Sequence, residues 1–298
     1  MALDLRTDCT FLGPAFPEPF VLFELETALS KLGLLPKTTG AEGQALRASW
    51  DSYRRKLREL AVRGGALRVR NHVVEPLVER LGYARLVPAD EVETREGVER
   101  GGDLIVTADG GARLRVWCTD LDEDLAAPAR RGTAWRYSHL RIAQRVLLAS
   151  GERVGLLTNG TELRLLLCDP ARPDSEIVIA IDPGWKTSRE MPDSYRLLLA
   201  LASPAGVRAV PDLIGKARLQ QARVTKELRK QARQAVERFV QEVLDHPDNR
   251  AALAAYTDRA RLARDLWREG LVTVYRLLFV LKLESSDDPA RAFSFAST

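Results

Sequence analysis

Cysteine and histidine are scarce in this chain of 298 residues, which contains three of each. Cys9, Cys118 and Cys168 lie far apart and form no C-x-x-C pair, which excludes a zinc-finger spacing. Their odd number argues against a disulfide framework. The three histidines are scattered, which argues against a His-rich metal site. These absences favour a protein of a reducing, cytoplasmic compartment.

Long apolar runs are also absent. No uninterrupted apolar stretch approaches the roughly 20 residues that a membrane span needs. The N-terminus, MALDLRTDCT, has acidic residues where a signal peptide has a basic region followed by an apolar run. We therefore expect neither a membrane span nor a membrane partner.

The chain also lacks an excess of one charge, because 45 Lys and Arg side chains are set against 41 Asp and Glu side chains. The net charge of +4 permits nucleic-acid binding without arguing for it. What is present is a hydrophobic fraction of 45%, which allows a sizeable core and argues against global disorder. The length suits one large domain or two ordinary ones.

The first 66 residues predict an N-terminal helical segment. Gly13-Pro14 and Pro17 make the first 17 residues an irregular lead-in. EPFVLFELETALSKLGLL then has apolar positions at helical spacing. QALRASWDSYRRKLRELAVRG is a charged helix whose apolar face is formed by Leu46, Trp50, Tyr53, Leu57 and Leu60.

Residues 67–205 predict an α/β (or α+β) domain. LRVRNHVVEPLVERLGY is a helix that ends at Gly82, and GDLIVTADGGARLRVWCTD forms two strands around an Asp-Gly-Gly turn at 109–111. A helix, a hairpin and the strand EIVIAID follow. This order suits a mixed sheet with helices packed on it.

The helix and the hairpin have clear local signals. RYSHLRIAQRVLLASG has Ser138 as its N-cap and Gly151 at its end. In RVGLLTNGTELRLLL, two apolar strands flank Asn159-Gly160, a strong hairpin turn. We expect Thr158 and Asn159 to shape this turn rather than to act in catalysis.

From residue 206 the chain is almost purely helical, which predicts an all-helical connector over 206–298. LIGKARLQQARVTKELRKQARQAVERFVQEVLDH is one long helix, strongly basic through Arg233. ALAAYTDRARLARDLWREGLVTVYRLLFVLKLES gives one or two more. The nearly continuous apolar run from Leu271 to Leu283 is expected to be buried.

Acidic residues on this scaffold follow the order of a metal-dependent nuclease of the PD-(D/E)XK type. Glu75 and Glu79 lie on the first helix of the α/β domain, and Asp103 opens a strand after Gly101-Gly102. Such nucleases hold Mg²⁺ between an Asp at a strand start and an acid on the next strand, so that the metal activates water. A Lys two residues beyond the second acid stabilises charge. Asp103 is the candidate metal ligand.

The second strand departs from this pattern. The natural alignment puts Trp117 where the acid should be and Thr119 where the lysine should be. Asp120 and Asp122 follow, but a one-residue shift on a strand reverses the face. With one acid left, Mg²⁺ binding and charge stabilisation should both fail. We therefore expect no cofactor, and Mg²⁺ only if the nuclease site is active.

The same residues have purely structural interpretations. Asp103 suits a turn or a strand edge as well as a degenerate metal site. A solvated helix face explains Glu75 and Glu79, and Trp117 is most simply a core aromatic residue.

Further motifs, in this order, resemble a known group of enzymes. A Gly-Gly-Asp strand, a second strand, a helix with Gln144 and then LLTNGTELRLLL are similar to the nuclease-type N-terminal region of fused restriction–methylation enzymes. Type I restriction subunits carry a similar TNG hairpin. VYRLLFVLKLES resembles the helix that leads into the adenine methyltransferase domain of type IIG enzymes and of BREX and DISARM phage-defence systems. The resemblance covers roughly residues 67–285.

The resemblance implies a PD-(D/E)XK-like sheet in which Asp103, Glu75, Glu79 and Gln144 are the candidates for a former catalytic site. It also implies a downstream methyltransferase domain or defence-system subunits as partners. The chain holds neither a Gly-rich loop for S-adenosylmethionine nor an Asn-Pro-Pro-Tyr-like loop for a flipped adenine. We therefore expect it to be the N-terminal region of a larger protein.

Two basic concentrations are candidates for contact with duplex DNA, one on the helix after Ser138 and just before it, the other on the long helix after residue 206. Such side chains can bind a phosphate backbone with salt-dependent affinity, or can simply form solvated helix faces. The DNA-binding candidates are Arg136, Arg141, Arg145, Lys226, Arg229, Lys230 and Arg233, with Arg130 and Arg131 beside the first group.

Three functions remain open. We prefer a non-catalytic, nuclease-like region that engages duplex DNA or partner subunits. The second is an active Mg²⁺-dependent endonuclease with an acid recruited from Asp120, Asp122 or Glu91. The third is an interaction module without a DNA role, in which the apolar helix from Leu271 to Leu283 packs against a partner.

Overall fold

The computed structural model describes residues 3, 5, 9–60, 64–108, 111–128, 130–131, 134–135 and 137–284. The chain divides into two compact units, residues 1–221 and residues 222–298. The first unit includes both the segment 1–66 and the predicted α/β segment 67–205. The division falls inside the long helix that follows.

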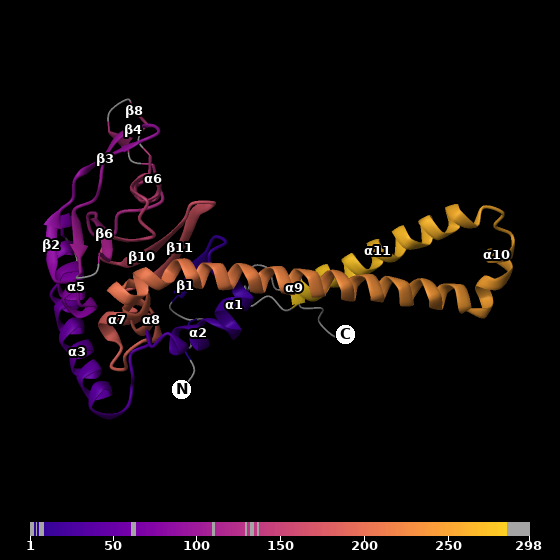
Figure 1. The fold of residues 1–298 in the computed structure, drawn as a ribbon, viewed down its shortest axis with the longest axis horizontal. Helices are drawn as coiled ribbons and strands as arrows, with labels where there is room; N and C mark the ends of the chain where they lie inside the picture. Colours follow the sequence, from indigo (N-terminus) through magenta and orange to yellow (C-terminus); the bar gives the residue numbers. More distant parts are fainter. Residues whose placement is uncertain are drawn as a thin grey trace. The chain divides into compact units, whose positions relative to one another are not determined.

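The first unit is a mixed α/β fold around a seven-stranded sheet of order β1-β11-β10-β9-β6-β5-β2 (Figure 1). Neighbouring strands are antiparallel except β6 and β9, which are parallel and are joined through helix α6 (His139–Ser150). The strands are β1 (Cys9–Leu12), β2 (Arg85–Pro88), β5 (Leu104–Thr107), β6 (Arg113–Cys118), β9 (Val154–Thr158), β10 (Glu162–Asp169) and β11 (Arg172–Ala180). The expected mixed sheet flanked by helices is confirmed.

Helices and two small hairpins complete this unit. The helices are α1 (Glu18–Phe23), α2 (Leu25–Lys31), α3 (Gly40–Glu59), α4 (Ala66–Val69), the π-helical turn η1 (Arg70–Val74), α5 (Glu75–Leu81), α7 (Gly184–Thr187) and α8 (Asp193–Ala202). The hairpins are β3 (Glu91–Thr94) with β4 (Gly97–Arg100), and β7 (Arg130–Arg131) with β8 (Ala134–Trp135). Helix α9 (Pro204–Asp245) starts in this unit and ends in the second.

Strand β6 shows how the sheet separates two layers. Leu114, Val116 and Cys118 belong to the large core, which also contains the buried side chains of α3, η1, α5 and α8. Trp117 belongs to a smaller core with the apolar side chains of α6. Alternate residues of a strand face opposite sides, so this pattern places α5 and α6 on opposite faces of the sheet. Trp117 is a core aromatic residue, as the sequence predicts.

The lead-in before α1 is more ordered than the sequence indicates. Residues 9–12 form β1, whose residue Cys9 pairs with Ile179 of β11. The expectation of an irregular segment was therefore wrong for these four residues. Their regularity depends on a partner strand far along the chain, which no local pattern reveals.

The second unit consists of the end of α9, a 3₁₀ turn η2 (Pro247–Asn249), α10 (Arg250–Ala254) and α11 (Arg259–Glu284). Within it, α11 returns alongside α9 (Figure 1). The two helices lie close together at Gly270, where a Cβ would lie 2.9 Å from Val236 Cγ1 and 3.3 Å from Phe239 Cδ1. A side chain at Gly270 would therefore separate the helices.

Among the described residues, no single helix is both long and apolar enough to cross a membrane, and only α8 and α9 taken together, bent by 91°, reach that length and composition.

Candidate functional site

Asp103 stands directly before β5, where each of its carboxylate oxygens accepts one hydrogen bond. Its Oδ2 accepts a hydrogen bond from the backbone N–H of Cys118 at 2.7 Å, and its Oδ1 accepts one from Arg100 at 2.6 Å. Gly102 makes this approach possible, because it has a φ of +121° and a Cβ would lie 2.9 Å from the carbonyl oxygen of Val116. The local chain thus locks Asp103 against β6.

Glu75 is the first residue of α5, the helix that precedes β5 in the chain. Arg70 Nε donates to Glu75 Oε1 at 2.9 Å across the π-helical turn η1. Pro76 has no N–H, so the regular helical ladder is interrupted here. The hydroxyl of Tyr53 donates to the carbonyl oxygen of Val73 at 3.0 Å and stabilises the turn. Glu79, one turn further on α5, is exposed.

Cys118 lies beside Asp103, whose Oδ2 accepts its backbone N–H. Burial raises the pKa of its thiol to about 12, and the negative charge of Asp103 adds to the rise. Arg70 lowers this pKa, Glu75 raises it, and Arg100 lowers it. The charges of two carboxylates and two guanidinium groups therefore act on the pKa of one buried thiol. Each carboxylate already has an arginine as its counter-ion.

The face of β6 that carries this cluster differs from the sequence-based alignment. The alignment placed Trp117 and Thr119 at the acid and lysine positions. The residues of β6 that share a core with α5 are Val116 and Cys118, while Trp117 faces the α6 layer. Trp117 therefore does not share a face with α5, because neighbouring residues of a strand point to opposite faces. Both pairs lack an acid and a lysine.

The acids proposed as replacements are tied to other structural roles. Asp120 Oδ1 accepts from the backbone N–H of Ala66 at 2.9 Å, at the start of α4. Asp122 has a φ of +61° and accepts from the hydroxyl of Thr161 at 3.3 Å. Glu91 lies on β3, opposite Arg100 in the β3–β4 hairpin. In the part of the chain that the structure describes, no three His, Cys, Asp or Glu side chains are grouped to hold a metal ion.

Gln144, the remaining candidate for a former catalytic site, is buried on α6. That helix packs against β9, β10 and β11, on the opposite face from α5. The contacts of Asp103 described above do not involve Gln144. The sheet therefore separates Gln144 from the acid on α5.

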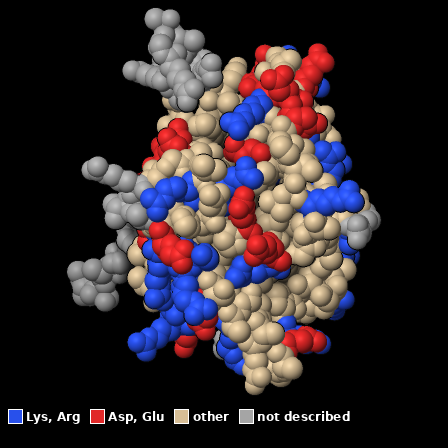
Figure 2. Space-filling model, turned by 90° about the vertical axis from the view of Figure 1, so that its left-hand side faces the viewer, with Lys and Arg blue, Asp and Glu red and all other residues tan. Residues whose placement is uncertain are grey.

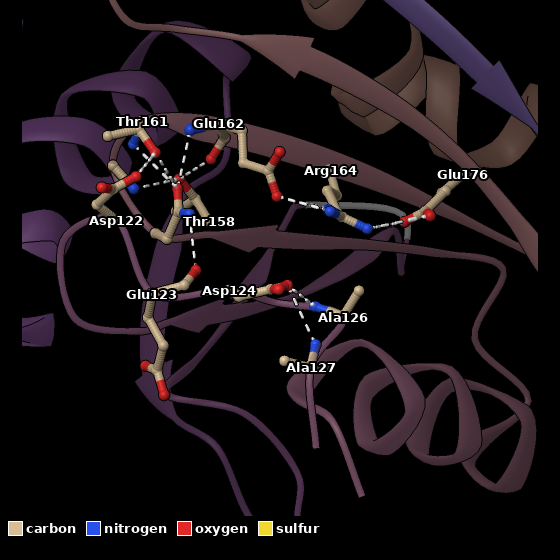
Figure 3. A network of polar contacts seen from close by, with 12 residues as sticks. Asp122, Glu123, Asp124, Ala126, Ala127, Thr158, Thr161, Glu162, Arg164 and Glu176 are labelled. Carbon is tan, nitrogen blue, oxygen red and sulfur yellow. Dashed lines mark hydrogen bonds and ion pairs between the residues drawn. The ribbon is translucent and has the colours of Figure 1, made fainter. Parts of the chain in front are cut away.

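The TNG turn is a structural anchor (Figure 3). Asn159 is buried, and its Oδ1 accepts from the backbone N–H groups of Thr161 and Glu162 at 3.0 and 2.8 Å. Its Nδ2 donates to the carbonyl oxygen of Glu123 at 2.9 Å, which ties the hairpin to the loop after β6. Thr158 Oγ1 accepts from the N–H of Gly160 at 3.1 Å. Sequence reasoning missed the contact with the loop, because it joins residues 36 positions apart.

Beside the turn, Arg164 of β10 bridges two acids (Figure 3). Its Nε donates to Glu162 Oε1 at 2.8 Å, and its Nη1 donates to Glu176 Oε1 at 3.2 Å. Burial raises the pKa of Glu176, and the charge of Arg164 opposes that rise. This arginine serves the sheet and is not free for a ligand.

The arginines on and near α6 do not form one DNA-binding surface. The side chain of Arg145 is only 9% exposed, and it forms ion pairs with Glu96 and with Glu99 of the β3–β4 segment. Its guanidinium also lies 4.5 Å from the ring centroid of Tyr137. Arg145 must therefore be removed from the predicted DNA-binding set, because its charge is buried and neutralised. Arg141 is exposed, and Arg136 lies outside the described residues.

The face of the molecule shown in Figure 2 mixes Lys and Arg with Asp and Glu, with neutral surface between them. Over most of this face such mixing gives no broad field of one sign, although Lys and Arg gather at its lower left. Further basic residues that could attract a polyanion come from another helix.

Helix α9 provides them. Lys226, Arg229 and Lys230 are exposed, and no ion pair involves them among the described residues. Arg233 is also exposed but donates to Glu237 of the same helix at 2.9 Å. The structure therefore keeps three of the four predicted basic residues of this helix free for contact with an anion.

The apolar end of α11 is exposed, contrary to the expectation of burial. Tyr275 is 63% exposed and Phe279 is 65% exposed, and Leu277, Leu278 and Leu281 are exposed as well. The sequence pattern correctly indicates an apolar helix, but its composition does not say which surface covers it.

Comparison with protein-family models, with curated protein sequences and with solved structures finds no match.

Proposed function

We propose that this chain is a non-catalytic, nuclease-like α/β unit with a helical extension, and that it engages duplex DNA without cleaving it. In this proposal it is the N-terminal region of a restriction or phage-defence adenine methyltransferase. The observation that carries DNA engagement is the set of exposed cations on α9, Lys226, Arg229 and Lys230, for which the described part of the structure shows no ion pair.

The connectivity supports the nuclease-like part of the proposal. Helix α5 precedes the antiparallel strands β2, β5 and β6, and α6 then leads to β9, which is parallel to β6. Asp103 stands at the start of β5, and Glu75 stands on the preceding helix. This is the order that the resemblance to nuclease-type regions implies.

The polar contacts support the absence of cleavage. A catalytic Mg²⁺ needs carboxylate oxygens that are free to coordinate it. Asp103 and Glu75 are instead paired with Arg100 and Arg70. On β6, the strand that pairs with β5, the residues that share a core with α5 are Val116 and Cys118, and neither is an acid or the lysine that stabilises charge on a phosphate. The residues present do not fit a catalytic metal.

A charge-reversal experiment tests the DNA part of the proposal. We expect the full chain to bind a fluorescent duplex at low salt, measured by anisotropy, with an affinity that falls steeply as salt rises. The triple variant Lys226→Glu, Arg229→Glu, Lys230→Glu should lose most of this affinity. Three lost phosphate contacts should reduce the slope of log K against log salt by about 2.7.

The matched control is the triple variant Arg250→Glu, Arg264→Glu, Arg268→Glu, whose three targets are exposed on α10 and α11. It changes the net charge by the same amount. If both triple variants lose affinity equally, net charge rather than α9 explains the binding. If the unmodified chain shows no binding to a duplex at low salt, the proposal is wrong.

The exposed apolar end of α11 favours a second candidate function, an interaction module. Five large apolar side chains between Tyr275 and Leu281 are exposed on about two helical turns. Patches of this kind often mark protein–protein contacts. The partner would be a downstream methyltransferase domain or another subunit of a defence system. Pull-down of that partner by the native chain, lost in Phe279→Asp, together with no DNA binding, would favour this candidate over the first.

A further inference from the structure

Residues 222–235 of α9, here called the bare segment, have almost no protein cover. In this segment only Val224 and Ala232 are half-buried, and every other residue is exposed. Before it, Leu213, Ile214 and Ala217 are buried in the core, and after it Val236 is fully buried against α11. The bare segment thus links two well-packed stretches of one helix.

The bare segment is strongly positive. It contains five basic residues and one acidic residue, Glu227, so its net charge is 5 − 1 = +4. The whole chain also has a net charge of +4, and the bare segment alone accounts for as much. Isolated helices of this length are marginal in water, because most helical stability in proteins comes from packing of one face. A partner of opposite charge would supply the missing cover.

The polar side chains extend around a wide arc of the helix. At about 100° per residue, the basic residues span an arc of about 120°, from Arg229 to Arg223. Gln234, Glu227 and Gln231 extend it by about 80° more. Gln231 donates to Glu227 at 3.3 Å, which holds these two side by side. The remaining side carries apolar and small residues, namely Val224, Ala235, Leu228, Ala232 and Thr225.

We propose that the bare segment lies in the major groove of B-form DNA. A helix that rests on the outside of a duplex needs one narrow basic stripe. A helix inside the groove meets phosphates on a wall and base edges on the floor, so it needs a wide polar arc in which basic side chains stand beside hydrogen-bonding ones. The major groove, about 12 Å wide, admits a helix, and the bare segment spans about 21 Å along its axis.

The residue types also fit the floor of the groove. Arg can bond to guanine O6 and N7, Gln to adenine N6 and N7, and Glu can accept from cytosine N4. Arg223, Gln231, Gln234 and Glu227 supply these groups on one side of the helix. This inference rests on the proposed binding of duplex DNA and specifies how the duplex is held.

The test compares affinities of the full chain for four forms of one duplex, measured by fluorescence anisotropy at fixed low salt. The forms are plain DNA, DNA in which glucosylated hydroxymethylcytosine fills the major groove, plain DNA saturated with the minor-groove ligand netropsin, and the matching RNA duplex. A-form RNA has a major groove too deep and narrow for side chains. We expect glucosylated DNA and duplex RNA to bind about tenfold more weakly, and netropsin to change the affinity by less than about twofold.

Two variants test which face of the bare segment enters the major groove. We expect Gln231→Ala with Gln234→Ala to weaken binding of plain DNA by about three- to tenfold, whereas Thr225→Ala on the outer side changes nothing. Helical circular dichroism checks that all variants fold. Equal affinity for plain and glucosylated DNA would overturn the groove placement while leaving DNA binding in place. Failure to bind plain DNA at all would instead refute the proposed function.

Discussion

Gly160, in the turn between β9 and β10, lies where an added side chain should lower the free energy of unfolding. Its φ is +83°, and a Cβ would lie 2.9, 3.0 and 3.1 Å from side-chain atoms of Leu121, Leu60 and Val69. Gly151, at the end of α6, has a φ of +70° with nothing within 4 Å of the Cβ position. Gly151→Ala therefore isolates the backbone cost, and Gly160→Ala adds crowding.

The two costs can be estimated separately. The left-handed backbone costs an alanine about 1–2 kcal/mol, and overpacking of a close-packed site adds about 1–3 kcal/mol. In both variants the alanine restricts the unfolded chain, which returns about 0.4–1 kcal/mol. We expect the free energy of unfolding to fall by about 1.5–4 kcal/mol for Gly160→Ala and by about 0.5–1 kcal/mol for Gly151→Ala.

Urea unfolding followed by tryptophan fluorescence measures this difference, because Trp50, Trp117 and Trp185 are buried in the first unit. With a slope of about 2–3 kcal/mol per M, the Gly160→Ala midpoint should lie roughly 0.5–2 M below that of the native chain. The Gly151→Ala midpoint should lie much closer to the native one. Equal midpoints for the two variants would refute the packing of this turn against Leu60, Leu121 and Val69.

Experiments on Arg145, Cys118 and Phe279 test other parts of the structure. Arg145→Ala should lower the free energy of unfolding by about 1–3 kcal/mol, because it leaves Glu96 and Glu99 without their counter-ion. The affinity for duplex DNA, measured by anisotropy, should change less than about twofold. A loss of affinity as large as that of Lys230→Ala would show that Arg145 contacts DNA. The pKa of Cys118 is raised to about 12 from the ordinary value of 9.0, so its thiol ionises at lower pH in the unfolded chain than in the folded one, and its contribution to stability is present below pH 9 and declines as pH rises toward 12. Mass spectrometry after maleimide treatment at pH 8 should find Cys118 unlabelled in the native protein and labelled in urea. Rapid labelling of the native protein would contradict the burial of Cys118. Phe279→Asp should leave the urea midpoint within about 0.3 M of the native value and should reduce binding of a hydrophobic dye, because the Phe279 ring is 65% exposed. A large fall in the midpoint would mean that the ring is buried.

Local signals were enough to predict several elements of the fold. Ser138 Oγ accepts from the backbone N–H of Arg141 at 3.2 Å and begins α6, and Gly151 ends it in the left-handed conformation. The hairpin β9–β10 turns at Asn159-Gly160, as predicted. In these cases the determining residues are neighbours in sequence, so their chemistry is visible without a structure.

Features that depend on distant partners could not be predicted in the same way. The pairing of β1 with β11 requires a strand about 170 positions away. The burial of Arg145 requires Glu96 and Glu99 from a hairpin that the sequence analysis did not anticipate. The apolar run of α11 indicates a need for cover, but exposure of Phe279 depends on what packs beside it.

The candidate site was predicted only in part. The sequence indicates an acid at the start of a strand and another on the preceding helix, and the structure brings Asp103 and Glu75 near Cys118. The face that each residue of β6 takes could not be predicted, because an alignment does not fix the register of a strand to one residue. The arginines that neutralise the two acids depend on a π-helical turn and on the β4–β5 connection, which local patterns do not reveal.

The most direct test of DNA engagement without cleavage is a filter-binding titration of the full chain against supercoiled plasmid, at low salt and in the presence of Mn²⁺. We predict that the plasmid is retained, that retention falls as salt rises, and that the DNA eluted from the filter is still supercoiled. Absence of retention would contradict DNA engagement. Eluted DNA that is nicked, with nicking abolished by Asp103→Asn, would contradict the loss of catalysis.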